Sequence, residues 1–266
     1  MPTQSSLTQT PAQLGDRLIK LTAKGTKRGH VEEDAFSWAR TPRRPFWLPL
    51  QGYAGIVADL HYGELATAKA CGHTAAILPE PEAKACLAVQ RDDEQFHARL
   101  YARYLARLGT EGTVTSGVRD AYERCLSWPG DPLGLVLAFN VVLEGEAMRL
   151  QRYFATRFPC PLFAELNRRI LADEARHIAF GRIYGRPGLQ RLDTEERIAL
   201  YRWLKAIWWD CAVAVRGRFD GVGGWILRAL HPPLEQSWRR QTDSLLDLGL
   251  IRPEELARLE RNGGPG

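Results

Sequence analysis

The 266-residue sequence lacks the features that direct a chain to a membrane, to a disulfide framework or to nucleic acid. No apolar run reaches the ~18 residues of a transmembrane helix, and no basic start followed by an apolar stretch opens the chain, so we expect a cytoplasmic protein without a membrane partner. The five cysteines form no Cys-x-x-Cys pair, which argues against a disulfide framework, a zinc knuckle and a rubredoxin-type iron site. The net charge is +5, but basic residues form no dense block, so a nucleic-acid partner is not expected.

Histidine is also scarce, and two of the six histidines stand in the same motif. The motif reads D-E-x-x-H at residues 93–97 and again at residues 173–177, 80 positions later. In a helix, a glutamate and a histidine three residues apart point from the same face, one turn from each other. This spacing is typical of metal ligands, and its duplication predicts a metal site.

Two further glutamates follow the same 80-residue offset. Glu64 precedes Glu94 by 30 residues, and Glu144 precedes Glu174 by 30 residues. A Pro-x-Pro break lies midway in each interval, and proline ends one helix and is tolerated in the first turn of the next. Each glutamate then stands 15 residues from its turn, roughly 22 Å along antiparallel helices, so the two members of a pair meet at the same height. The breaks are at residues 79–81 and 159–161.

This pattern resembles the ferritin-like di-iron and di-manganese carboxylate bundles over roughly residues 50–185, in which two helices each give a Glu and two give Glu-x-x-His. Residues 143–145 (Leu-Glu-Gly) and 173–181 are more similar to the oxygen-activating branch than to storage ferritins. That branch contains ribonucleotide reductase small subunits, monooxygenase hydroxylases and N-oxygenases. The N-oxygenases add a histidine one turn before the last Glu. This chain has Ile170 there, which argues against an N-oxygenase without excluding one. The resemblance implies six ligands: Glu64, Glu94, His97, Glu144, Glu174 and His177.

The same resemblance implies an all-α, ferritin-like four-helix bundle with additional C-terminal helices. Its cofactor would be two Fe ions, with Mn or mixed Mn/Fe also compatible with these ligands, and O2 would be the co-substrate. By similarity to the monooxygenase hydroxylases, we expect crossed contacts outside the ligands, from Asp93 to His177 and from Asp173 to His97. The alternative is that one or both aspartates are ordinary helix-surface residues.

Three positions near the ligands leave alternatives open. Asp59 lies on the same expected helix as Glu64, and Glu146 could replace Glu144, although it breaks the 80-residue offset. His61, one turn from Glu64, could hydrogen-bond to a metal ligand, be an extra ligand or be a hydrogen-bonded interior histidine.

Tyr101 stands one turn beyond His97 and is the candidate catalytic residue. Its placement resembles the radical-bearing tyrosine of ribonucleotide reductase small subunits, although a plain pocket-lining tyrosine fits equally well. The matching position in the second motif is Gly181, which would leave space near the metals.

We expect three regions: an N-terminal extension (1–45), a four-helix bundle with the dinuclear site (46–190) and C-terminal helices packed on it (191–266). Residues 1 to about 16 are rich in Ser, Thr, Gln and Pro and should be mobile. A crossover with a short helix at 120–126 joins the second and third bundle helices. We expect the tryptophans within residues 203–209 to pack against the bundle rather than to line a substrate pocket or a partner surface. The expected bundle helices are 53–76, 81–108, 132–157 and 161–184; a fifth follows Asp193, breaks fall at 221–224 and 232–233, and a last helix covers 254–260.

Three functions fit this sequence. The first is a di-iron oxidase or oxygenase that hydroxylates, desaturates or N-oxidises a small or carrier-bound organic substrate with electrons from an external donor. The second is iron storage or peroxide handling, as in ferritin or rubrerythrin. The third is a radical-generating or non-catalytic helical subunit. Bundles of this kind often form homodimers, but no interface can be located from the sequence.

Overall fold

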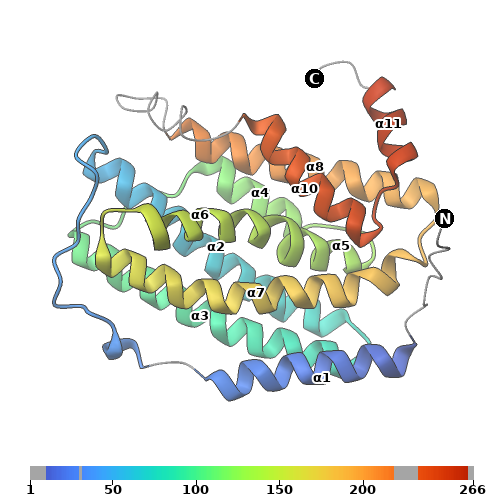
Figure 1. Ribbon diagram of the computed structural model, residues 1–266, viewed down its shortest axis with the longest axis horizontal. Helices are drawn as coiled ribbons and strands as arrows, with labels where there is room; N and C mark the ends of the chain where they lie inside the picture. The colour runs from blue at the N-terminus through green and yellow to red at the C-terminus, as the bar shows by residue number, and fades with distance from the viewer. Residues whose placement is uncertain (1–9, 30–31, 219–232, 263–266) are drawn as a thin grey trace.

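The computed structural model describes residues 10–29, 32–218 and 233–262, and every regular element within these ranges is a helix. Figure 1 shows long helices running side by side along the longest axis of the molecule. Four of them form the predicted bundle: α2 (Leu50–Ile77), α3 (Pro81–Leu108), the segment from α5 to α6, and α7 (Pro161–Leu189). The all-α bundle predicted from the sequence is therefore confirmed. None of the described helices combines the length and the hydropathy needed to cross a membrane.

The two helical hairpins turn at the Pro-x-Pro breaks, as predicted from the sequence. Pro81 and Pro161 each stand in the first turn of a new helix, and the residues before each break end the preceding helix in an extended conformation. α2 packs along α3, and α6 packs along α7. This pairing brings the middle of each helix level with the middle of its partner.

α7 continues to Leu189 rather than ending near residue 184, and Pro187 lies inside its last turn. The packing of that turn explains the difference, because a Cβ added at Gly185 would meet Leu137 at 2.8 Å. Leu189 is 2% exposed. Burial against the neighbouring helix thus outweighs the poor helix propensity of glycine and proline.

The third bundle helix changes its hydrogen-bond pattern midway. It begins as α5 (Pro132–Leu137), where the Asp131 side chain accepts a bond from the Leu133 amide at 2.8 Å. It continues as the π-helix η2 (Ala138–Leu143) and ends as α6 (Glu144–Arg157). The preceding crossover carries α4 (Ser116–Leu126). The π-helical stretch was not predicted, and it lies directly before a candidate metal ligand.

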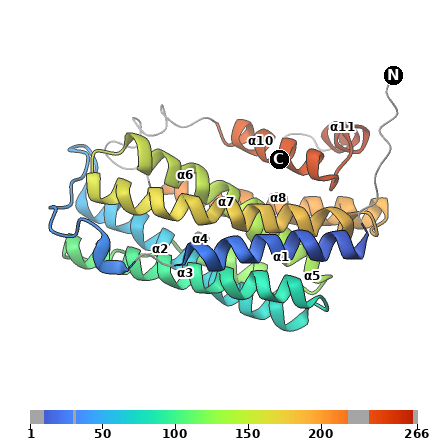
Figure 2. The ribbon, with the colours of Figure 1, turned by 60° about the horizontal axis from the view of Figure 1, so that its bottom comes forward.

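The expectation that residues 1 to about 16 are mobile is wrong from Pro11 onward, where the N-terminal helix α1 (Pro11–Arg28) begins. Residues 1–9 lie outside the described residues. Thr10 and Gln13 form a capping box, and Pro11 occupies the first turn, so this polar segment carries a complete helix start. α1 lies along α3 and α7, as Figure 2 shows, and Leu18 is fully buried there. A short 3-10 turn, η1 (Glu33–Ala35), follows.

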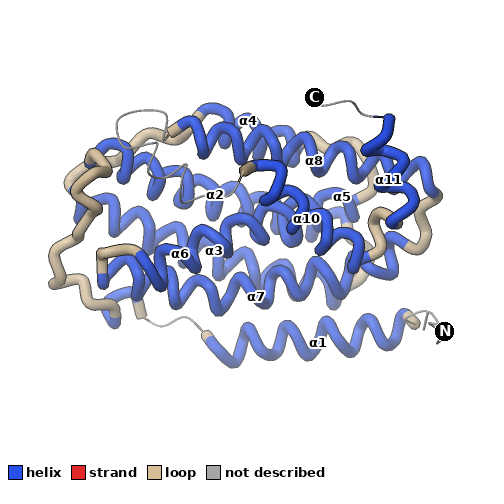
Figure 3. Tube along the Cα trace, turned by 45° about the horizontal axis from the view of Figure 1, so that its top comes forward, coloured by secondary structure: helices blue, strands red, loops and turns tan. Residues whose placement is uncertain are grey.

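The C-terminal helices cover the other side of the bundle (Figure 3). α8 (Thr194–Gly217) starts at a capping box on Asp193 and packs against α4 and η2. α10 (Leu234–Leu248) packs against α8 and α7, and α11 (Pro253–Asn262) follows it. Trp208 of α8 is 1% exposed and belongs to the core. The expected breaks at 221–224 and at 232 lie outside the described residues.

Candidate metal centre

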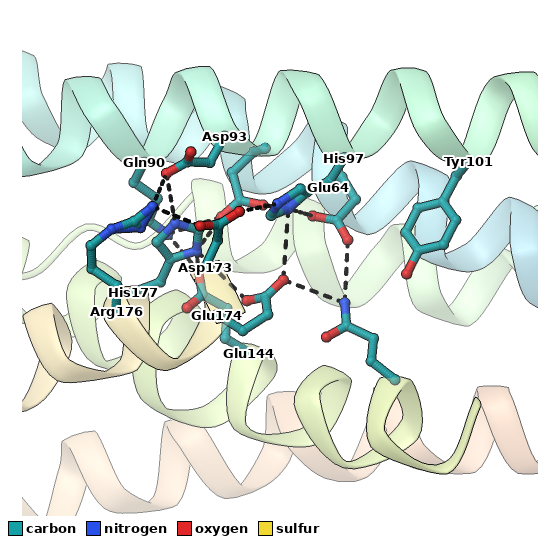
Figure 4. A network of polar contacts seen from close by, with 12 residues as sticks. Glu64, Gln90, Asp93, His97, Tyr101, Glu144, Asp173, Glu174, Arg176 and His177 are labelled. Carbon is teal, nitrogen blue, oxygen red and sulfur yellow. Dashed lines mark hydrogen bonds and ion pairs between the residues drawn. The ribbon is translucent and has the colours of Figure 1, made fainter. Parts of the chain in front are cut away.

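The six predicted ligands come together in one cluster between the bundle helices. Figure 4 shows Glu64, His97, Glu144, Glu174 and His177 pointing toward one another. Each is buried, with at most 6% exposure. They form two overlapping groups of four, and within each group one ligand atom per residue lies within 4.8 Å of the others. Glu94 and Glu174 belong to both groups, Glu64 and His97 only to the first, and Glu144 and His177 only to the second. This arrangement can hold two cations that share two carboxylates.

Both imidazoles are oriented by aspartates from the opposite hairpin. His97 Nε2 lies 3.3 Å from Asp173, and His177 Nε2 lies 3.2 Å from Asp93, which is the crossed pairing expected from the sequence. The Nδ1 atoms face the glutamates, at 3.4 Å from Glu94 for His97 and 3.0 Å for His177. When Nε2 donates its proton to an aspartate, the Nδ1 lone pair is directed into the carboxylate cluster.

Two arginines of α7 neutralise these aspartates. Arg176 contacts Asp93 at 2.6 Å and Asp173 at 3.1 Å, and thus joins the outer partners of both imidazoles. Arg169 forms a second ion pair with Asp173. Burial raises the pKa of Asp173, but the bond to His97 and the charges of the two arginines outweigh burial and lower it to about 2. Asp173 therefore stays ionised and holds His97 in place.

Three buried amides that the sequence analysis missed support the glutamates. Gln90 Nε2 donates to Glu94 at 3.1 Å and to Glu144 at 2.5 Å, and Asn140 donates to the Gln90 side-chain oxygen at 2.7 Å. Gln151 Nε2 lies 3.4 Å from Glu64 and 3.3 Å from Glu174. Gln90 and Asn140 each precede a glutamate by four residues, and this spacing on one helix face was the available signal.

The cluster is poorly satisfied by protein groups alone. One oxygen of Glu144, one oxygen of Glu174 and the Nδ1 of His177 are buried and make no hydrogen bond within the described part of the chain. Burial raises the pKa of Glu64 and of Glu144, whereas contacts with His177 hold that of Glu94 well below its usual range despite burial. Buried polar atoms normally have partners, so these atoms fit a site completed by cations.

The alternative ligands are occupied elsewhere or face away. The Asp59 carboxylate binds the Arg218 guanidinium, with one contact at 2.9 Å. Glu146 accepts a bond from the Trp208 indole at 2.8 Å. His61 is half-buried and forms no hydrogen bond with the six candidate ligands, so the structure does not bring it into the cluster. The positions therefore favour Glu64 and Glu144 as the ligands.

Tyr101 is fully buried beside the His97 and Glu64 end of the cluster (Figure 4). Its hydroxyl donates to Asn167 at 3.1 Å, and burial together with the charges of Glu64 and Glu174 raises its pKa well above the usual range. The matching position, Gly181, does not open space near the cluster. A Cβ there would lie 2.7 Å from the Asn140 Cβ, because η2 packs directly on this glycine.

A cavity of about 290 Å³ adjoins the cluster. The side chains of Glu64, Glu94, Glu144 and Glu174 line one side of it, and most of the other lining groups are apolar. The cavity lies where α2, α4 and α6 meet α8 and α10. Among its lining residues are Leu60, Tyr122, Leu143, Trp208, Ala212 and Val215.

Comparison with known proteins identifies the architecture. No protein-family model and no curated protein matches the sequence. Among solved structures, a variant of an R2-like ligand-binding oxidase with an aerobically reconstituted Mn/Fe cofactor matches with a TM-score of 0.59 at 18% identity, covering 91% of this chain and 88% of that one. The chain has the ferritin-like fold. The R2-like ligand-binding oxidase without metal cofactor also matches this ferritin-like chain, with a TM-score of 0.53 at 17% identity and 91% coverage of each chain.

Proposed function

We propose that this protein binds two metal ions, iron or a manganese and iron pair, and uses them to oxidise a small organic substrate with O2. The observation that carries the proposal is the pair of overlapping ligand groups that share Glu94 and Glu174 beside a cavity. The Mn/Fe cofactors of the R2-like oxidases with the same fold support this choice of metals.

The position of each ligand in the two groups indicates which ion it would hold. Glu64, Glu94, His97 and Glu174 would hold one ion, and Glu94, Glu144, Glu174 and His177 would hold the other. The carboxylates suit hard cations, and one imidazole per ion leaves coordination positions for other ligands. When bound, the two reduced ions supply the electrons and the Lewis acidity for dioxygen reduction.

The surrounding residues hold this arrangement. Asp93 and Asp173 keep each imidazole in one orientation, at 3.3 and 3.2 Å. Gln90 and Gln151 each link two carboxylates by hydrogen bonds of 2.5–3.4 Å. Fixing the ligands before metal binds reduces the rearrangement needed on binding.

The cavity would hold the substrate against the metal pair, since four ligand carboxylates line it and its other walls are largely apolar. In a monooxygenase reaction, one oxygen atom enters the substrate and the other leaves as water. That balance requires two electrons and two protons, so an external electron donor is a necessary partner of this activity.

Oxygen consumption tests the proposal. Protein loaded anaerobically with Fe(II), or with Mn(II) and Fe(II), is mixed with O2, a reductant and candidate apolar substrates, and O2 uptake and oxidised product are measured. We expect metal-dependent O2 uptake that Glu174→Ala abolishes and that Glu165→Ala, a change on the same helix outside the ligand set, retains. Metal-loaded wild type that consumes no O2 would refute the oxidase activity.

Tyr101 supports a second candidate, a radical-generating subunit. Its ring is fully buried, and it lies close enough to the candidate ligands Glu64 and Glu174 for their charges to raise the pKa of its hydroxyl. In that case, O2 treatment of metal-loaded protein would leave an electron-spin signal that disappears in Tyr101→Phe together with activity. Substrate oxidation retained in Tyr101→Phe would eliminate the radical role.

A further inference from the structure

The π-helix η2 sets the direction of one candidate metal ligand. It ends at Leu143, and the backbone N–H of the next residue, Glu144, bonds to the carbonyl of Phe139, five residues earlier. A π-turn inserts one extra residue, and one residue of an α-helix corresponds to a rotation of about 100°. Without the π-turn, Glu144 and all of α6 would therefore be rotated by about 100° relative to α5. The metal-facing direction of Glu144 depends on η2 remaining π-helical.

A side chain from the C-terminal helix α10 holds this π-turn. Gln241 Nε2 donates to the carbonyl of Val141 at 3.2 Å and to that of Val142 at 2.8 Å. Gln241 is 3% exposed, so water does not replace these bonds readily. Where a helix changes from π to α geometry, the backbone carbonyls make poorer hydrogen bonds within the helix. Buried carbonyls require hydrogen-bond partners, and here a side chain provides one.

Glycines on two sides of η2 allow this contact. The Cβ of an alanine at Gly145 would lie 3.2 Å from the Gln241 Nε2, so the amide rests on the residue next to Glu144. On the other side, Gly181 of α7 accepts the backbone of η2, where a Cβ would come 2.7 Å from Asn140. η2 is thus enclosed between α7 and the Gln241 amide.

α10 itself is well anchored. The Trp238 indole donates to the Tyr201 hydroxyl at 3.1 Å, and the Arg182 guanidinium donates to Ser244 at 2.9 Å. These bonds tie α10 to α8 and to α7. The Gln241 amide is therefore presented to η2 from a fixed support.

We propose that Gln241 is a positioning residue for the metal centre, which keeps η2 π-helical and thereby directs Glu144 to the second metal ion. This inference rests on the proposed function, because it assigns a role toward the two metal ions. Gln241 acts through the carbonyls of Val141 and Val142 and belongs to neither ligand group. Loss of the Gln241 amide should weaken metal binding by the group that contains Glu144 and His177. Metal binding by the group that contains Glu64 and His97 should be unchanged.

Metal titration of full-length variants tests this assignment. Mn(II) is added anaerobically to metal-free wild type, Gln241→Leu and the control Thr242→Val, and free Mn(II) is followed by its electron-spin signal. Leucine removes both donated bonds, whereas Thr242 contacts Tyr201 at 3.3 Å and leaves η2 untouched. We expect two ions per wild-type chain, and in Gln241→Leu a second ion bound about 10-fold more weakly or worse, with the first within about twofold of wild type.

Each outcome separates the two claims. Two tightly bound ions in folded Gln241→Leu, or an equal loss in Thr242→Val, would overturn the role of Gln241 and leave the proposed function standing. Wild type that binds fewer than two ions would overturn the proposed function and this inference with it. If Gln241→Leu does not fold, Gln241→Asn decides, because its shorter side chain withdraws the amide from both carbonyls while keeping a polar group: weakened binding of the second ion supports the assignment, and wild-type binding refutes it.

Discussion

Arg176 provides a quantitative test of the charge network around the metal centre. The Arg176 side chain is 11% exposed, and its guanidinium contacts Asp93 at 2.6 Å and Asp173 at 3.1 Å, so Arg176→Met leaves two buried carboxylates with one cation fewer. At an effective dielectric constant of about 20, each contact contributes about 5 to 6 kcal/mol of Coulomb attraction, much of which offsets the cost of burying the charges. Removing one partner of such a buried pair typically costs ~3–5 kcal/mol.

The assay is thermal unfolding of the metal-free protein, with Arg186→Met as the control on the same helix. The Arg186 contact with Asp247 is exposed on both sides, at 51% and 64%, so its loss should cost less than ~1 kcal/mol. For a chain of this size we expect Arg176→Met to lower the melting temperature by about 6–20 °C. Equal, small shifts in both variants would refute a buried network that stabilises the fold.

Three further predictions follow from the geometry. Burial raises the pKa of Glu64 and Glu144, so metal binding must displace protons from the metal-free site, and metal affinity should rise with pH. Calorimetry in buffers of different ionisation enthalpy should detect the released protons. Metal binding that does not depend on pH would contradict these pKa directions. Gly181→Ala places a Cβ 2.7 Å from Asn140 and should destabilise the protein by ~1–3 kcal/mol in urea unfolding; no loss would show that η2 can move away. Ala212→Trp should fill the cavity and reduce substrate oxidation without changing the metal content. Turnover and metal analysis of the same protein sample measure the two quantities, and unchanged turnover would place the substrate elsewhere.

The candidate ligands could be predicted from the sequence because helix geometry fixes their spacing. Glu64, Glu94, Glu144 and Glu174 lie at equal distances from two proline turns, and a hairpin of regular helices brings such residues to one level. The structure places all four in one buried cluster.

Other features depend on contacts that no local pattern encodes. η2 is π-helical although its residues are apolar except for Asn140, and its partner Gln241 lies about 100 residues away in the chain. Pro187 reads as a helix stop, but the packing of its turn on Leu133 and Leu137 overrides that signal. α1 differs from the sequence prediction for another reason: the Ser, Thr, Gln and Pro content of the segment predicts mobility, whereas Thr10 and Gln13 form a capping box that starts a helix.

The central claim is a dinuclear metal centre, and metal content per chain tests it most directly. Protein loaded anaerobically with Fe(II), freed of excess metal and analysed for iron should contain about two ions per chain, and Glu174→Ala, which removes a ligand shared by both groups, should lose one or both. A wild-type protein that stays folded and metal-free after loading, with the same behaviour in Glu174→Ala, would mean that the duplicated motif is structural and that the oxidase proposal is wrong.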